Sequence, residues 1–404
     1  MSLGRRAVLA AALPGAAAAA VLPQPDGGRI FERRWFGLHL HQADRIAWPA
    51  AAFGTWRLWD AGVSWADLQP TADAWNPARL DTLLALAERH QVEVVLPLAR
   101  TPAWAALRPA EPAAFAPGNA SPPRDLADWG RFVQRVVQHT RGRVRAYELW
   151  NEANVPMFWS GDMATLVAMA RLLREAVARH DPGALVVAPS GAGLLDRRRG
   201  FVADFVAAGG ARHVDVLNFH LYTGPHAPEV MLQPVADLVA GARLPLWNTE
   251  SGYWVRPGPG QRGARHADAL EPELAAAYLV RAHVLARALG VERFVAYAWD
   301  NGDLPFVQDD KATPNAVGRA YTAMVKRLTG TRLLACEADR SGPCSARFAG
   351  SDGREFRLAW SAGRERERRW RVPGGPVRVS TLDGTPVADG ADTVDLAPMP
   401  VVLQ

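Results

Sequence analysis

Short runs of apolar and aromatic residues recur between residues 36 and 300, separated by segments with helical spacing. The runs are Phe36–Leu40, Thr55–Trp59, Val92–Ala99, Ala146–Trp150, Leu185–Pro189, Val214–Tyr222, Leu244–Thr249 and Arg293–Asp300. Their nearly continuous hydrophobicity is typical of parallel strands buried on both faces. Eight strands alternating with helices predict an α/β fold, a (β/α)8 TIM barrel. A doubly wound open sheet would use the same alternation, but no Gly-rich phosphate loop follows the first strand.

The pattern changes after about residue 330, where helical spacing stops and short alternating runs begin. These runs are Ala346–Phe348, Phe356–Trp360, Trp370–Val372, Val377–Thr381 and Val394–Leu396. Gly, Pro and Asp-Gly turns separate them, as expected of antiparallel strands. We therefore expect a catalytic barrel over residues 35–330 and a small C-terminal antiparallel β-sandwich domain over residues 331–404, to which residues 23–34 could add a strand.

The first 22 residues have the pattern of a signal peptide that is removed on export. Arg5 and Arg6 form a positive start, Ala7–Ala20 is apolar and small, and Ala18–Ala20 offers a cleavage site. The expected location is periplasmic or secreted, through a route that the paired arginines leave open between the general and twin-arginine pathways. An apolar anchor that stays attached is the alternative. No later run approaches eighteen apolar residues, so no integral membrane segment is expected.

Charge and cysteine content restrict the partners. The net charge of +5 comes almost entirely from arginines, which are scattered or mixed with acids, as in residues 364–369. Mixed runs are typical of a solvated face, so we expect no nucleic-acid partner. The two cysteines, Cys336 and Cys344, are too few for a metal site, and in an exported protein they predict a disulfide.

Two apolar runs end in a carboxylate. They are Tyr147–Glu152, which reads YELWNE, and Leu246–Glu250, which reads LWNTE. In a TIM barrel the carboxyl ends of all strands meet at one face. Two carboxylates on different strands are the minimal equipment for cleaving a glycosidic bond, because one protonates the leaving oxygen and the other attacks the anomeric carbon. Each Glu could alternatively be a solvated strand end or half of a structural ion pair.

Other polar and aromatic residues fall at the same predicted rim. They are His39, His41, Arg57, Asn151, His220, Tyr222, Trp299 and Asp300. The chain also contains 15 tryptophans, several in predicted loops. Because sugar rings stack on indole, Trp104, Trp159 and Trp254 are candidate subsite residues, with core packing as the alternative for each.

The Asn-Glu after the fourth strand and the Glu at the end of the seventh resemble the retaining glycoside hydrolases of the large (β/α)8 clan. Within it, Glu148–Asn154, followed by a β-domain, is similar to family 39, which includes β-xylosidases, iduronidases and bacterial exopolysaccharide hydrolases. The resemblance covers about residues 35–330. It implies that Glu152 is the general acid/base, Glu250 the nucleophile and Asn151 a ligand of the sugar 2-hydroxyl.

The resemblance also implies roles for further residues, on less specific motifs. Arg57 would lie near the nucleophile, His220 and Tyr222 would follow the sixth strand, and Trp299 would stack on the sugar. His39 is a further candidate for substrate binding. Ala153 stands where Pro often follows the acid/base, which weakens assignment to a subgroup. We expect a monomer that acts on a polysaccharide or oligosaccharide and needs neither cofactor nor metal.

Two rival functions remain at this level. His39, His41, His220 and Asp300 also resemble a metal-dependent amidohydrolase, which would use a metal-bound water. That site would need a His at the fifth strand, which instead ends in Pro189-Ser190, and it leaves Glu250 without a role. The second rival is a carbohydrate-binding protein without catalysis. A retaining enzyme would hold the two carboxyl groups about 5–5.5 Å apart, and an inverting enzyme about 6.5–9.5 Å.

Overall fold

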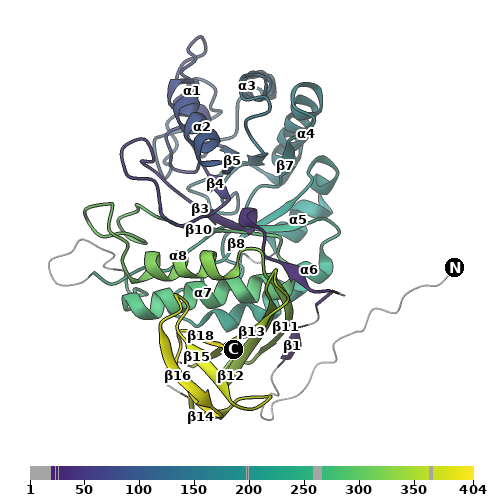
Figure 1. The fold of residues 1–404 in the computed structure, drawn as a ribbon. Helices are drawn as coiled ribbons and strands as arrows, with labels where there is room; N and C mark the ends of the chain where they lie inside the picture. The colour runs from purple at the N-terminus through teal and green to yellow at the C-terminus, as the bar shows by residue number, and fades with distance from the viewer. Residues whose placement is uncertain are drawn as a thin grey trace.

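The computed structural model describes residues 20–22, 24–25, 27–196, 198, 200–257, 266–363 and 367–404. Its central sheet is parallel, with the strand order β7-β6-β5-β4-β3-β10-β9-β8 (Figure 1). The strands are β3 (Phe36–Leu38), β4 (Thr55–Arg57), β5 (Glu93–Leu98), β6 (Ala146–Leu149), β7 (Leu185–Val187), β8 (Leu217–His220), β9 (Leu246–Ser251) and β10 (Arg293–Ala296). A parallel bridge between Val187 and Val216 joins the two ends of this order, so the sheet closes into a barrel. The predicted TIM barrel is confirmed.

Helices follow the strands and surround the barrel (Figure 1). They are α1 (Trp65–Leu68), α2 (Ala78–His90), α3 (Leu126–His139), α4 (Met163–His180), α5 (Phe201–Ala207), α6 (Leu232–Gly241), α7 (Pro272–Leu289) and α8 (Ala316–Leu328), with 3-10 turns η1 (Arg33–Trp35), η2 (Gly210–His213) and η3 (Pro228–Met231). Side chains of Asp125, Asp162 and Asn315 accept hydrogen bonds from first-turn amides of α3, α4 and α8. Of the described residues, none lies in a helix with both the length and the apolarity to cross a bilayer.

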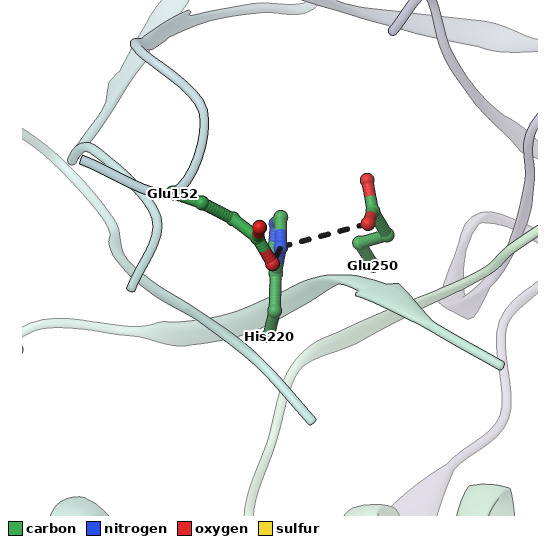
Figure 2. A group of neighbouring side chains, drawn as sticks. All are labelled: Glu152, His220 and Glu250. Atoms are coloured by element: carbon green, nitrogen blue, oxygen red, sulfur yellow. Dashed lines mark hydrogen bonds and ion pairs between the residues drawn. The ribbon is translucent and has the colours of Figure 1, made fainter. Parts of the chain in front are cut away.

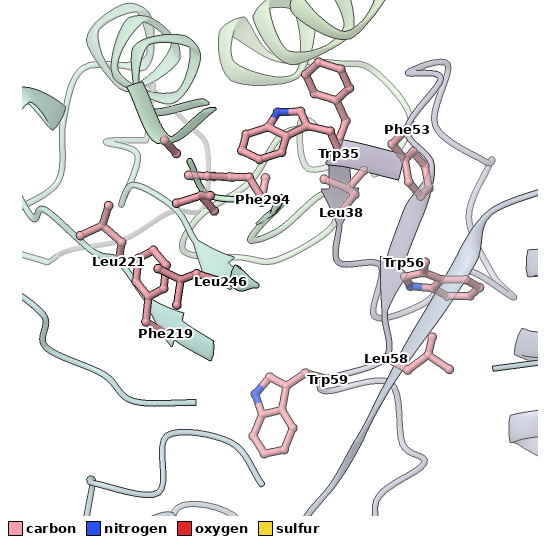
Figure 3. Close-up of a cluster of buried hydrophobic side chains, with 14 of the residues drawn as sticks. Trp35, Leu38, Phe53, Trp56, Leu58, Trp59, Phe219, Leu221, Leu246 and Phe294 are labelled. Atoms are coloured by element: carbon pink, nitrogen blue, oxygen red, sulfur yellow. The ribbon is translucent and has the colours of Figure 1, made fainter. Parts of the chain in front are cut away.

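Large apolar side chains fill the space between the barrel and its helices. Figure 3 shows part of this core, in which Trp35, Trp56 and Phe294 are buried. A separate cluster of Val95, Ala146, Val187, Val216 and Trp247 fills the barrel itself. Alternate residues of a strand face opposite sides, so the strands bury apolar side chains on both faces, as their sequences indicated, while the interior also holds buried polar residues. This packing holds the strands, and therefore the residues at their ends, in fixed positions.

The C-terminal strands form an antiparallel sheet in the order β1-β11-β12-β13-β18-β15-β16, with β2 also on β11. They are β1 (Ala20–Leu22), β2 (Arg29–Ile30), β11 (Arg332–Ala338), β12 (Pro343–Ala349), β13 (Glu355–Ser361), β15 (Val377–Ser380), β16 (Pro386–Ala391) and β18 (Val401–Leu403). A two-stranded sheet of β14 (Glu367–Arg371) and β17 (Thr393–Leu396) packs against it through Val379, Val394 and Leu403. The predicted β-sandwich is confirmed.

A buried ion pair ties this sandwich to the barrel. Arg281 of α7 contacts Glu229 of η3, and both side chains are essentially inaccessible to solvent. Trp360 of β13 donates its indole N–H to the same carboxylate at 2.8 Å. Arg281 also donates to the carbonyl of Ala362 at 2.9 Å. Displacing the sandwich would remove the hydrogen bonds of Trp360 and Ala362 to this buried ion pair. Because buried charges that lose their partners are costly, these contacts hold the sandwich in place against the barrel.

The predicted disulfide is not formed: Cys336 and Cys344 are both buried thiols. Cys336 of β11 lies opposite Ala346 of β12, which places Cys344 two residues along the partner strand. Diagonal neighbours of this kind are about 7–8 Å apart, beyond the usual Cα separation of a disulfide. The Cys344 sulfur instead accepts a hydrogen bond from the amide of Asp339 at 3.2 Å.

Candidate active site

The turn that carries Glu152 leaves the end of β6 in an unusual conformation. Trp150 and Glu152 have positive φ angles of 62° and 44°. Left-handed backbone at a bulky residue costs about 1–3 kcal/mol and is concentrated at functional sites. Ser190, after β7, holds the turn, because its hydroxyl oxygen accepts from the Glu152 amide at 2.8 Å and its carbonyl from the Ala153 amide at 3.0 Å. Ser190 thus positions the Glu152 turn, a contact that the sequence did not reveal.

A β-bulge in β9 presents two consecutive side chains to the barrel interior. Phe219 of β8 lies opposite Asn248, but the next residue, His220, lies opposite Glu250, so Thr249 is the extra residue. Alternation would send neighbouring residues to opposite faces. The bulge lets Thr249 contact Asn218 while Glu250 contacts Arg57. Bulges often adjust side-chain direction next to active sites in this way.

Glu152, His220 and Glu250 converge at the carboxyl end of the barrel (Figure 2). The Nδ1 atom of His220 lies 3.0 Å from Glu152 Oε1 and 3.8 Å from Glu250 Oε1. One carboxylate oxygen of each glutamate lies within 4.8 Å of the other. The Glu152 side chain is 14% exposed and that of Glu250 is 9% exposed. Both carboxyl groups are therefore largely desolvated and close together.

Arg57 at the end of β4 is the positive centre of the site. Its Nη1 atom donates to Glu250 Oε2 at 2.9 Å, and its Nη2 atom donates to Asn151 Oδ1 at 2.7 Å. Glu148 of β6 binds the same guanidinium through both oxygens, at 2.8 Å from Nε and 2.5 Å from Nη2. Since its oxygen accepts from Arg57, the Asn151 amide nitrogen is the end that can donate to a ligand.

The two glutamates differ in their surroundings. Burial raises the pKa of Glu152 to about 7, against the opposing charges of Arg57 and Arg198. Burial also raises the pKa of Glu250, but the Arg57 guanidinium opposes this shift, as does the Tyr222 hydroxyl, which donates to Glu250 Oε1 at 2.7 Å. Glu250 has a direct cationic partner and Glu152 does not, so the site favours a proton on Glu152 and a charge on Glu250.

The residues of the metal-dependent alternative do not assemble. His39 Nε2 lies 3.1 Å from the carbonyl oxygen of Thr249, and a carbonyl can only accept, so this nitrogen carries a proton. Asp300 accepts from the backbone amides of His41 and Gln42, each at 2.8 Å. Among the described residues, the group with metal-ligand geometry is Glu152, His220 and Glu250. The geometry therefore fits the expected pair of carboxylates for acid–base chemistry better than the alternative metal site of His39, His41, His220 and Asp300.

The candidate tryptophans differ in accessibility. Trp159 is only 4% exposed and makes a T-shaped contact with Trp150, with ring centroids 4.7 Å apart, so too little of its ring is accessible to support the expected subsite role. Trp299 is also buried. Trp104 is half-buried and donates to the Gln69 carbonyl at 2.9 Å. Trp254 is half-buried between Tyr222 and His266, with its centroid 5.6 Å from Tyr222, itself in contact with Glu250.

Comparisons with known proteins give the fold a context. No protein-family model matches the chain. A β-xylosidase from Geobacillus stearothermophilus is 28% identical over 141 residues, which are 30% of this chain and 27% of that enzyme. The matched segment therefore spans about a quarter of that relative's length.

Solved structures match over nearly the whole chain. The GH39 enzyme from Xanthomonas axonopodis pv. citri has a TM-score of 0.63 at 17% identity, covering 96% of this chain and 97% of the other. A monomeric β-xylosidase from Caulobacter crescentus CB15 has a TM-score of 0.59 at 18% identity, with 96% and 97% covered. The fold matches that of GH39 enzymes. The fold that the family 39 resemblance implied is thus confirmed.

Proposed function

We propose that the protein is a retaining glycoside hydrolase in which Glu152 is the general acid/base and Glu250 the nucleophile. The observation that carries this proposal is the pairing of two buried carboxyl groups whose oxygens approach within 4.8 Å and whose surroundings differ. Retaining enzymes hold these groups about 5–5.5 Å apart, whereas inverting enzymes leave about 6.5–9.5 Å for a water molecule. The close approach therefore favours double displacement.

The first step would break the glycosidic bond. Glu152 donates its proton to the leaving oxygen while a Glu250 oxygen bonds to the anomeric carbon, so the leaving group departs as an alcohol. Arg57 and Tyr222 keep Glu250 ionised and oriented before attack. The Asn151 amide nitrogen donates to the 2-hydroxyl of the sugar, the role that the family resemblance implies.

The second step would release the sugar. Glu152, now a carboxylate, accepts a proton from water, whose oxygen bonds to the anomeric carbon as Glu250 leaves. Loss of the Glu250 charge in the intermediate and its return here explain why a single residue can act first as acid and then as base. The two inversions restore the original anomeric configuration.

The substrate is part of the same proposal. The relatives named β-xylosidases make a β-linked xylose the first glycone to test, in an oligosaccharide or polysaccharide. The monomeric β-xylosidase with the same fold supports a monomer. We also propose export to the periplasm or beyond, on the pattern of residues 1–22.

A panel of aryl glycosides followed by proton NMR tests the activity and its stereochemistry. We expect turnover of at least one β-glycoside, with the β-anomer of the sugar appearing first. First appearance of the α-anomer would contradict double displacement. Turnover that is no faster than that of a Glu152→Ala, Glu250→Ala double variant across the panel would instead favour a binding protein. Glu355→Ala, at a half-exposed residue of the sandwich, is the control for an unrelated lost carboxylate.

A further inference from the structure

A chain of hydrogen bonds runs from the barrel interior to the carboxyl group of Glu152. The Thr249 hydroxyl donates to Asn218 Oδ1 at 2.9 Å. The same Thr249 oxygen lies 3.2 Å from His220 Nε2, and His220 Nδ1 lies 3.0 Å from Glu152 Oε1. Asn218, Thr249 and His220 are completely buried. Bulk water does not reach these groups, so their hydrogen bonds go to neighbouring side chains, although the amide nitrogen of Asn218 has no partner.

With the Asn218 amide oxygen facing Thr249, counting protons along this chain gives the tautomer of His220. Thr249 has one hydroxyl proton, and the Asn218 oxygen takes it, so Thr249 can only accept from His220. His220 Nε2 must then carry the ring proton. Burial lowers the pKa of His220 to about 4, so the ring is neutral and its Nδ1 atom is an acceptor. Glu152 must therefore be the donor to Nδ1, which requires a protonated carboxyl group.

We propose that Asn218 and Thr249 are positioning residues that hold His220 as its Nε2–H tautomer and thereby keep the catalytic proton on Glu152. This inference rests on the proposed function for the role of that proton. His220 itself neither gains nor loses a proton in either step. When Glu152 has protonated the leaving group, its carboxylate faces the lone pair of Nδ1, which favours taking a proton back from the attacking water.

The other charged groups around Glu152 and His220 do not determine the tautomer of His220. Arg57 and Arg198 both favour the ionised form of Glu152, and Glu250, within 4.8 Å, disfavours it. Around His220, Glu250 and Glu148 favour the charged ring while Arg57 opposes it. Of these groups, none touches His220 Nε2, so the choice of tautomer depends on Thr249.

Nitrogen NMR of the wild-type protein, with histidine labelled with nitrogen-15, tests the tautomer without any need for turnover. The signal of His220 is identified among the 10 histidines by its loss in His220→Asn. We expect a protonated Nε2 and an unprotonated Nδ1 at neutral pH. A protonated Nδ1 would mean that Asn218 has the reverse amide orientation and that Glu152 accepts from His220, and it would overturn the proposal.

Kinetics of Thr249→Val, with Thr249→Ser as the matched control that keeps the hydroxyl, test the consequence. Losing one hydrogen bond to the ring should lower the alkaline limb of kcat/KM by about one pH unit, which corresponds to on the order of tenfold less activity above that limb. The loss should be larger for poor leaving groups, and Thr249→Ser should largely restore the profile. Equal losses for good and poor leaving groups, with the limb unmoved, would mean that Thr249 only shapes β9 and would contradict the proposal. A wild-type protein without glycosidase activity would reject the proposed function but leave the NMR result to decide the tautomer.

Discussion

Arg57 and Glu148 form a two-pronged ion pair across the barrel interior, and neither side chain has any exposed surface. Their strands, β4 and β6, are separated by β5. The pair leaves Arg57 Nη1 free to donate to Glu250, so Glu148 sets the direction of the guanidinium that contacts Glu250. Although burial acts to lower the pKa of Arg57, Glu148 and Glu250 raise it above its usual range. The site thus retains a permanent positive charge.

Glu148→Gln should weaken both the fold and the site. Removing one member of a buried pair costs about 3–5 kcal/mol when the other charge is left uncompensated, and here Arg57 would keep only Glu250 as a charged partner, so this range is the upper bound. We expect a loss of up to this size in the free energy of unfolding from denaturant titration, and a lower kcat from a misdirected Arg57. Glu88→Gln is the matched control, because Glu88 pairs with Arg143 while 55% exposed and should cost no more than about 1 kcal/mol. Equal effects of the two variants would show that the Arg57–Glu148 pair has no special role.

The pH dependence of kcat/KM should follow the two glutamates. The proposed mechanism requires a protonated Glu152, so activity should fall as pH rises through about 7, the pKa to which burial raises this group. It should also fall on the acidic side, as Glu250 takes up a proton. With an activated aryl glycoside, Glu152→Gln should lose the alkaline limb, since no group is left to titrate. An alkaline limb near pH 7 that survives this substitution belongs to another residue.

Glu152→Ala should separate substrates by their leaving groups. A phenolate that leaves readily needs little protonation, so its first step should survive and hydrolysis of the intermediate should become limiting. A natural sugar leaving group should lose about 10²–10⁴-fold, the usual contribution of a general acid. Steady-state and burst kinetics on a series of aryl glycosides and one oligosaccharide measure the contrast. The same loss on all of them would argue against the acid/base role.

Much of the barrel and its rim could be predicted because strands that are buried on both faces are nearly continuous apolar runs in the sequence. Apolar runs that end in Asn151-Glu152 and at Glu250 place both acids at strand ends, and the structure brings them together with Arg57, His220 and Tyr222. Glu148 was overlooked although it had a signal. A carboxylate in the middle of an apolar strand needs a buried partner, and Arg57 was the available cation.

Features that depend on tertiary geometry could not be predicted in this way. The bulge at Thr249 shifts the pairing of β9 with β8 by one residue, and no residue type in β9 predicts this shift. The disulfide was wrong because spacing along the chain does not give the cross-strand register of Cys336 and Cys344. Trp159 was chosen for its loop-like surroundings, whereas its packing on Trp150 decides its burial.

Trapping of the glycosyl-enzyme tests the central claim most directly. A 2-deoxy-2-fluoro glycoside with a dinitrophenyl leaving group can be built on whichever glycone is turned over. The fluorine slows both steps by destabilising their oxocarbenium-like transition states, and the good leaving group keeps the first step fast, so the covalent intermediate should accumulate. Peptide mass spectrometry of the inactivated protein should find one sugar per chain, attached to Glu250, and Glu250→Ala should remain unlabelled. A label on Glu152 or any other residue, or an enzyme that hydrolyses the reagent with inversion and is never labelled, would contradict the assignment of Glu250 as the nucleophile.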